Sequence, residues 1–185
     1  MIKPLLVVVT GRPASGKSTL AKMLCAEIRC PLISRDELKE GYIHTTGYRH
    51  SHLSAAAALH IYETFFETIG LLVSRGISIV VEAAFQDKLW RPKLLALIEK
   101  AEIRIVLCET TVEIAKARFV DRLGNDPERD RFHGDAAVKE QGGLMTDRYE
   151  PVNIGVRILA VDTTNQYDPD IKQIIAFIFG SCKRS

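Results

Sequence analysis

Apolar residues follow two patterns along the chain, and their alternation predicts which segments are strands and which are helices. Continuous apolar runs rich in Val and Ile are typical of strands covered on both faces, and they occupy residues 5–9, 77–81, 103–107 and 156–161, with a shorter run at 31–33. Helical spacing of apolar residues appears between these runs, at residues 17–28, 53–74, 88–100, 112–122 and 171–179. Strands that alternate with helices imply right-handed crossovers. We therefore expect a three-layer α/β/α sandwich around a mainly five-stranded parallel sheet.

Two stretches interrupt this alternation, and we expect both to be functional loops. Residues 41–51 are polar and aromatic, whereas residues 124–143 are strongly charged and contain four glycines. Long irregular segments in a compact domain are usually binding loops or lids, with disorder as the alternative for the second stretch. The chain shows no repeat and no linker-like composition, so we expect one domain over residues 1–185, with a lid at about 118–143.

Composition limits the cellular setting and the partners. Hydrophobic residues make up 46% of the chain, and the formal charge of +2 is too small to make nucleic acid or an anionic membrane a necessary partner. The four cysteines form no C-x-x-C pair, which favours free thiols in a reducing compartment over a metal site. The first apolar run is too short for a signal peptide, and no apolar stretch approaches the ~20 residues of a membrane span. We expect a cytoplasmic protein with no membrane partner.

A phosphate-binding motif, G-x-x-x-x-G-K-[ST], lies between the first predicted strand and helix. It is formed by Gly11, Arg12, Pro13, Ala14, Ser15, Gly16, Lys17 and Ser18. The glycines let the backbone curl so that successive N–H groups point into one concavity, at the positive end of a helix. We expect Lys17 to reach the β- and γ-phosphates of ATP, Ser18 to ligate Mg²⁺ and Thr19 to assist near the α-phosphate. The strand–loop–helix setting makes the motif specific and predicts a P-loop NTPase.

Two acidic residues are predicted at the carboxyl edge of the sheet, where ligands bind in parallel α/β folds. Asp36 follows the short run at 31–33, and there it would face the γ-phosphate and accept the proton of an attacking hydroxyl. The alternative is that Asp36 caps the helix that starts at Glu37. Glu82 ends an apolar strand in the Walker B pattern, which predicts that it holds Mg²⁺ through water or contacts the substrate. A solvated strand end is the alternative for Glu82.

Arginines in the predicted lid are candidates for stabilising the transferred phosphoryl group. Arg118 and Arg122 are four residues apart and share a helix face, and Arg131 follows in a charged segment. Arginine forks can compensate the charge on three phosphate oxygens, and a closing lid would exclude water. The alternative is a solvated face, because these arginines alternate with Asp121, Asp126, Glu128 and Asp130.

Candidate residues for binding the acceptor follow Asp36 in the sequence. Tyr42 and Arg49 follow Asp36 in the segment where the acceptor should bind, and their aromatic and guanidinium groups suit a sugar, a base or a phosphate equally. Four histidines lie in or near this segment, at positions 44, 50, 52 and 60. Their spacing does not favour a metal site, so we interpret them as structural or solvated residues.

Together these segments resemble a family of small P-loop kinases. The resemblance is carried by GRPASGKST, by ISRDELKEGY, by IVVEAAF followed by Arg91, and by R-x-x-x-R with ERDRFHGD. The family includes chloramphenicol phosphotransferase-like and zeta toxin-like kinases, gluconate kinase and polynucleotide 5′-kinase domains. It implies that Asp36 is the general base, that Arg118, Arg122 and then Arg131 act from the lid on ATP, and that Arg91 reaches the acceptor. Related polynucleotide kinases carry Val-Asp-Ala-Thr-Asn where this chain has Val-Glu-Ala-Ala-Phe, which weakens a nucleic-acid-end reading.

Three functional hypotheses follow from the sequence. The leading one is an Mg²⁺–ATP-dependent kinase that phosphorylates a hydroxyl of a small molecule. The second is a polynucleotide or nucleoside 5′-hydroxyl kinase, which is disfavoured by the low net charge and by the lack of an aromatic–basic stripe. The third is a non-kinase P-loop ATPase or nucleotide switch. A guanine switch would carry N-K-x-D, and residues 165–168 read N-Q-Y-D instead.

Overall fold

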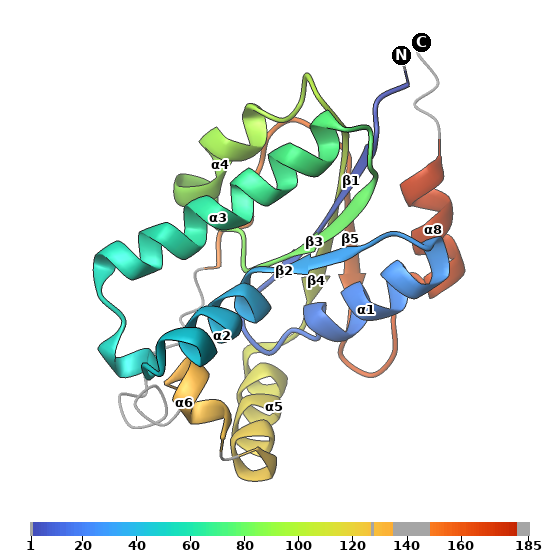
Figure 1. The fold of residues 1–185 in the computed structure, drawn as a ribbon. Coiled ribbons are helices and arrows are strands. Elements are labelled where there is room, and N and C mark those ends of the chain that lie inside the picture. The colour runs from blue at the N-terminus through green and yellow to red at the C-terminus, as the bar shows by residue number, and fades with distance from the viewer. Residues whose placement is uncertain (1, 127, 135–148, 181–185) are drawn as a thin grey trace.

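The computed structural model describes residues 2–126, 128–134 and 149–180, and a parallel β-sheet lies at its centre (Figure 1). The strands are β1 (Leu5–Gly11), β2 (Leu32–Ser34), β3 (Ile79–Glu82), β4 (Glu102–Glu109) and β5 (Ile158–Asp162). They are ordered β2-β3-β1-β4-β5, and each neighbouring pair is parallel. The five-stranded parallel sheet predicted from the sequence is confirmed.

Helices cover both faces of the sheet and extend beyond its carboxyl edge. They are α1 (Lys17–Ile28), α2 (Arg35–Thr46), η1 (His50–His52), α3 (Ala55–Ser74), α4 (Asp87–Leu95), α5 (Val112–Asn125), α6 (Arg129–His133) and α8 (Ile171–Phe179). In Figure 1, α3 and α4 lie on one face and α1 and α8 on the other, so the predicted three-layer α/β/α sandwich is confirmed. The same view shows α2, α5 and α6 gathered at the end where the strands finish.

Two apolar clusters, one on each face of the sheet, form the core. On the first face, Val8 and Val81 pack with an aromatic group from α3, α4 and the β3–α4 connection. Its rings include Phe65, Phe85 and Trp90, whose centroids lie 4.9–6.0 Å apart. On the other face, alternate strand residues pack with apolar side chains of α1 and α8. Strands buried on both faces explain why the sequence shows continuous apolar runs rather than alternation.

The helix α3 corrects one expectation from composition. Its 20 residues are long and apolar enough to cross a membrane, whereas no such stretch was expected from the sequence. Its buried face, which includes Phe65, Ile69 and Val73, packs into the core beside the sheet. Of its apolar stretch, 33% is buried inside the structure, so burial accounts for part of its apolar composition.

Two predicted boundaries were wrong. Residues 41–46 were expected to be irregular, but α2 continues to Thr46 and ends at Gly47, whose φ of 71° is left-handed. The space around Gly41 is open, so a glycine there weakens the helix without breaking it. The helix predicted at 88–100 ends instead at Leu95, three residues after Pro92. Within the predicted lid, α5 reaches Asn125 and α6 covers 129–133, while residues 135–143 lie outside the described residues.

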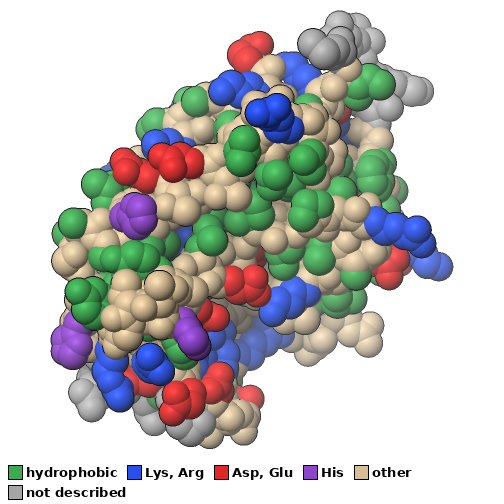
Figure 2. All heavy atoms as spheres, viewed as in Figure 1, with side chains coloured by type: hydrophobic (Ala, Val, Ile, Leu, Met, Phe, Trp, Pro, Cys, Tyr) green, Lys and Arg blue, Asp and Glu red, His purple; other side chains and the backbone are tan. Residues whose placement is uncertain are grey.

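Charged side chains gather at the end of the molecule where the strands finish. On the face shown in Figure 2, acidic, basic and histidine side chains lie close together at the end occupied by α2 and α6. The carboxyl ends of β1, β2 and β3, together with the loop between β1 and α1, reach this same end. The fold therefore brings charged groups from distant parts of the chain to one edge of the sheet.

Candidate active site

The loop between β1 and α1 has the backbone geometry of a phosphate cradle. Gly16 precedes α1 with a left-handed φ of 81°. A Cβ on Gly11 would lie 2.4 Å from Ser15 Oγ and 2.5 Å from the Cys108 carbonyl oxygen, so only glycine fits there. Because α1 starts at Lys17, the N–H groups of its first turn point toward the loop and favour an anion. The predicted phosphate-binding loop thus has the local structure that its motif requires.

Lys17 and Glu82 form a buried ion pair at the floor of this loop. Lys17 Nζ lies 3.6 Å from Glu82 Oε1, and Ser34 Oγ donates a 2.8 Å hydrogen bond to Glu82 Oε2. Lys17 is 8% exposed and Glu82 is 1% exposed. The solvated-strand-end interpretation of Glu82 is therefore wrong, because a carboxylate this deeply buried needs the ammonium and hydroxyl partners that it has.

The residues present here fit a magnesium ion. Glu82 Oε1 is buried and accepts no hydrogen bond among the described residues; its ion-pair partner Lys17 lies 3.6 Å away, so this oxygen can still accept a hydrogen bond from water or bind a metal ion. Ser18 lies one residue after Lys17 and lines the adjoining cavity. Among the described residues no group of three His, Cys, Asp or Glu side chains could hold a metal by itself. This donor set suits Mg²⁺, which usually keeps water and substrate phosphates as most of its ligands.

A cavity of about 780 Å³ connects the phosphate loop with α2, and we call it the α2-side cavity. Lys17, Ser18 and Asp36 all line it, so the predicted base faces the predicted phosphate site. Asp36 does not cap α2, because Ser34 Oγ accepts the N-terminal hydrogen bond from the Glu37 N–H at 3.5 Å. The capping alternative for Asp36 is therefore wrong, and its carboxylate is directed to other partners.

Cations hold the Asp36 carboxylate in its charged form. Arg35 Nη1 lies 3.4 Å from Asp36 Oδ1, and Lys39 Nζ lies 3.9 Å from the same oxygen. Burial alone would raise the pKa of Asp36, but nearby positive charge, to which Lys39 contributes most and Lys17 and Arg35 also contribute, lowers that pKa below its ordinary value. Asp36 is thus an ionised proton acceptor at neutral pH.

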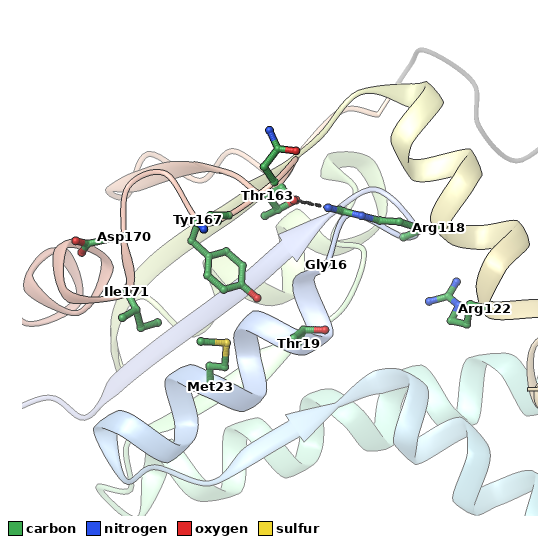
Figure 3. A pocket seen from close by; sticks show the side chains of 12 residues that line it. Gly16, Thr19, Met23, Arg118, Arg122, Thr163, Tyr167, Asp170 and Ile171 are labelled. Carbon is green, nitrogen blue, oxygen red and sulfur yellow. Dashed lines mark hydrogen bonds between the residues drawn. The ribbon is translucent and has the colours of Figure 1, made fainter. Parts of the chain in front are cut away.

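A second cavity of about 650 Å³ lies on the other side of the loop, between α1 and α8, and we call it the α8-side cavity (Figure 3). Arg118 extends from α5 to the start of the β5–α8 loop, where it donates hydrogen bonds to the Thr163 and Thr164 carbonyl oxygens. Tyr167 lies in the same cavity, opposite the α1 residues Thr19 and Met23. A cavity beside a phosphate loop that offers one aromatic ring, apolar side chains such as Met23 and Ile171, and polar groups suits a nucleotide base.

Arg122 lies where the two cavities meet. It lines both of them, as do Ala14 of the phosphate loop and Thr19 of α1. Its guanidinium carbon lies 5.7 Å from the centre of the Phe119 ring. Figure 3 shows Arg118 and Arg122 one helical turn apart on α5, both directed toward the loop. The structure therefore brings these two predicted arginines to the site.

Other predicted residues do not line either cavity. Arg131 stacks on Phe132 at 5.4 Å, and Arg91 is exposed on α4, where it pairs with Asp87 at 3.5 Å. Tyr42 packs beside His60, with ring centroids 6.0 Å apart, and Arg49 precedes η1 as an exposed residue. The motif residue Arg12 lines a separate cavity of about 380 Å³ beside β4. Tyr42, Arg49 and Arg91 line neither the α2-side nor the α8-side cavity, and their substrate roles stay predictions.

The α2-side cavity is lined instead by residues that sequence reasoning missed. Lys39, Glu40, His50, Arg129 and His133 all contribute to its wall. One signal for Lys39 was available, because a residue three after Asp36 on a helix shares its face. The same spacing applies to Glu40, four residues after Asp36 on α2, whereas His50, Arg129 and His133 come from segments beyond α2, and no local spacing rule connects them to Asp36.

The chain matches one known domain family over most of its length. A family described as an AAA domain matches residues 6–152. The chain belongs to this AAA domain family. The family resemblance that the motifs predicted is confirmed at this level, whereas no curated protein sequence matches the chain significantly.

Solved structures place this AAA domain among P-loop kinase-like folds. A candidate kinase from Chloroflexus aurantiacus shares 23% identity with a TM-score of 0.82, covering 95% of this chain and 97% of that chain. The APS kinase CysC of Mycobacterium tuberculosis, solved with AMPPNP and APS, shares 16% identity with a TM-score of 0.63, covering 96% and 99%. A gluconokinase from Sinorhizobium meliloti shares 19% identity with a TM-score of 0.58, covering 96% and 93%. At these identities the similarity establishes the fold.

Proposed function

We propose that this AAA domain is a cytosolic kinase that transfers the γ-phosphoryl group of ATP to a hydroxyl of a small molecule. One observation carries the proposal: the Asp36 carboxylate, freed from capping by Ser34, faces the same cavity as Lys17 and Ser18. A carboxylate in this place could also activate water, but the cavity of about 780 Å³ beside it has room for an acceptor larger than water, which favours a kinase over a nucleotide switch or a mechanical ATPase. A kinase needs such a carboxylate to orient and deprotonate the attacking oxygen.

The two cavities divide the reaction between them. ATP would place its base in the α8-side cavity, beside Tyr167 and the loop that Arg118 anchors. Its triphosphate would follow the phosphate loop, and the acceptor would occupy the α2-side cavity. Arg122 lines both cavities, so its guanidinium is placed to compensate charge on the phosphoryl group as it passes between them.

Proton transfer and charge compensation are then assigned to different groups. Asp36 takes the hydroxyl proton, and Lys17 together with the loop N–H groups stabilises the negative phosphate oxygens. Bound Mg²⁺, held by Ser18 and by Glu82 directly or through water, would neutralise further charge on the phosphates. Enclosure of both substrates limits access of water, which would otherwise compete with the acceptor.

Similar structures support this proposal. The neighbours include the gluconokinase and the APS kinase, which share the fold over nearly their whole length with this chain. The APS kinase was solved with AMPPNP and APS, so a fold of this type accommodates a nucleotide and a second ligand together. The acceptor of this chain is defined here only by its class, a hydroxyl compound that fits the α2-side cavity.

Replacing Asp36 with Asn tests the assignment of the base. The amide is similar in size but cannot accept a proton, so phosphoryl transfer should fall by roughly 10²–10⁴-fold while ATP affinity is retained. Asp121→Asn on the exposed side of α5 is the matched control and should leave both quantities unchanged. The measurements are ADP release with a panel of hydroxyl compounds, including oligonucleotide ends, and nucleotide titration. Full turnover by the Asp36 variant would reject the proposed mechanism.

A further inference from the structure

His133 of α6 contacts two residues of α2, Lys39 and Glu40, which lie one helical turn after Asp36. Its Nδ1 lies 3.1 Å from Lys39 Nζ, and its Nε2 lies 2.6 Å from Glu40 Oε1. The His133 side chain is 7% exposed, and Lys39 is also buried. Figure 1 shows α6 beside α2 at the carboxyl end of the sheet. Both ring nitrogens are therefore used, in a buried position that the proposed mechanism does not explain.

The chemistry of the three groups fixes the direction of both hydrogen bonds. A Lys ammonium only donates, so His133 Nδ1 accepts from Lys39 and its Nε2–H donates to Glu40. An imidazolium would point an N–H at the ammonium, and that arrangement is repulsive. In agreement, burial and the charge of Lys39 lower the pKa of His133 to about 3, so the ring is neutral. Neutral His133 can connect a cation and an anion at once.

The consequence reaches Asp36 through Lys39. Lys39 Nζ lies between the His133 ring and Asp36 Oδ1, at 3.1 Å and 3.9 Å. A lysine side chain has four flexible bonds, and its ammonium takes a fixed position only where its partners hold it. In this structure those partners are the carboxylate of the proposed base and the imidazole acceptor from α6.

We propose that His133 is a positioning residue for phosphoryl transfer, which holds Lys39 against Asp36 and anchors α6 to α2 through Glu40. The inference rests on the proposed function, since it assigns His133 a part in orienting the base of that reaction. His133 touches no reacting atom; it acts through Lys39 and through the placement of the wall that α6 contributes to the α2-side cavity.

Close packing of the next residue supports a fixed position for α6. Gly134 has a left-handed φ of 64°, and a Cβ there would lie 2.5 Å from the His50 ring. His50 belongs to η1, so the end of α6 is fitted against η1 as well as against α2. Two independent contacts, one polar and one steric, thus determine where His133 lies.

The alternative is that His133 merely stabilises the fold, and a pair of variants separates the two roles. His133→Leu still fills the buried position, with an apolar side chain, but it loses both hydrogen bonds. His133→Gln retains one acceptor and one donor at about the same separation, so it can still connect Lys39 and Glu40. His52→Leu, on the exposed face of η1, is the control for a histidine that lines none of the three cavities described above.

The kinetic result expected is a loss confined to the acceptor step. His133→Leu should lower kcat/KM for the acceptor by roughly tenfold or more, as expected for a lost hydrogen bond to a charged group, with nucleotide affinity unchanged. His133→Gln should recover most of that loss, and His52→Leu should match the wild type. Unchanged kinetics in His133→Leu would overturn the proposal, as would a Gln variant as impaired as the Leu variant.

Nitrogen-15 NMR of the histidine side chains gives a readout independent of activity. The wild type at pH 6 should show one neutral Nε2–H imidazole that is absent in His133→Gln. We call the two hydrogen bonds from His133 to Lys39 and Glu40 the bridge. A charged ring or the Nδ1–H tautomer would overturn the bridge at any level of kinase activity. If the expected signal is present but the wild type phosphorylates no acceptor, the proposed function and the positioning role fail together while the bridge itself stands.

Discussion

At the scale of single residues, the site is organised around charges that are buried in pairs. Lys17 and Glu82 lie 3.6 Å apart, almost fully buried, and Ser34 supplies the further hydrogen bond that the carboxylate needs. Burial of either charge alone would be strongly unfavourable, whereas the pair is tolerated. Lys17 therefore has two separable roles, since it neutralises Glu82 in the free protein and would bind phosphate in the complex.

Replacing Lys17 with Met tests both roles of this residue. The variant should lose most of its affinity for ATP, and it should lose about 3–5 kcal/mol of stability because Glu82 remains buried without its cation. Nucleotide titration and denaturant unfolding measure the two effects. The double variant Lys17→Met, Glu82→Gln should regain much of the stability while still failing to bind ATP. Equal losses of stability in the single and double variants would contradict the pairing argument.

At the scale of elements, α2 and α6 form a unit through buried titratable groups. His133 contacts Lys39 and Glu40, and burial and the neighbouring cations keep its ring neutral. Burial raises the pKa of Glu40, while burial lowers the pKa of Lys39. Burial therefore opposes the charged form of all three side chains, so the contact between the two helices should respond to acid.

The stability of the protein should fall through His133 as the pH drops from 6.5 to about 3. The unfolded ring binds a proton near its ordinary pKa of 6.5, but the folded ring does so only near pH 3. In this window the unfolded state binds more protons, so acid lowers stability, by at most about 1.4 kcal/mol per pH unit. Denaturant unfolding of wild type and His133→Gln at several pH values measures the difference. Parallel pH profiles for the two proteins would refute the assignment.

Gly134 allows a second test of how α6 is held, at its contact with η1. A Cβ on this residue would clash with the His50 ring and would also strain a backbone at φ 64°. Gly134→Ala should therefore destabilise the protein by about 1–3 kcal/mol and displace α6 from η1. Gly76→Ala provides the control, because it has a similar φ of 75° but open space around it, so only the backbone effect should appear. Equal losses in both variants would show that the contact with His50 is unimportant.

Elements with a strong local signal were predictable from the sequence, whereas contacts between elements were not. The apolar runs located β1 and β4 because strands buried on both faces need continuous apolar residues, and the motif located the phosphate loop. The end of α2 was missed because Gly41 sits in open space and does not end the helix. The bridge from Lys39 to His133 joins residues 94 positions apart, and no periodicity links them.

At the scale of the whole molecule, the α8-side cavity and the α2-side cavity lie on opposite sides of the phosphate loop. The α8-side cavity and the α2-side cavity share Ala14, Thr19 and Arg122, which lie at or beside the phosphate loop. The phosphate loop and the start of α1 therefore border both cavities. If each cavity holds one substrate, as proposed, then mutations should affect nucleotide binding and acceptor phosphorylation separately.

Stabilisation by a nucleotide should depend on the α8-side cavity and not on Asp36. A non-hydrolysable ATP analogue with Mg²⁺ at 100 times its Kd should stabilise the wild type by about 2.7 kcal/mol, because the ligand binds only the folded state. Arg118→Ala releases the loop at Thr163 and Thr164, so at the same analogue concentration most of this gain should disappear. Asp36→Asn should retain the gain in full, since its carboxylate faces the acceptor region.

Thermal unfolding with and without the analogue measures these shifts, and each variant without ligand provides its own reference. The comparison tests the division of the molecule, because it asks which side of the loop the nucleotide uses. If Asp36→Asn lost the stabilisation and Arg118→Ala kept it, ATP would bind on the α2 side. The acceptor would then have to approach from α8, and Asp36 could not act as its base.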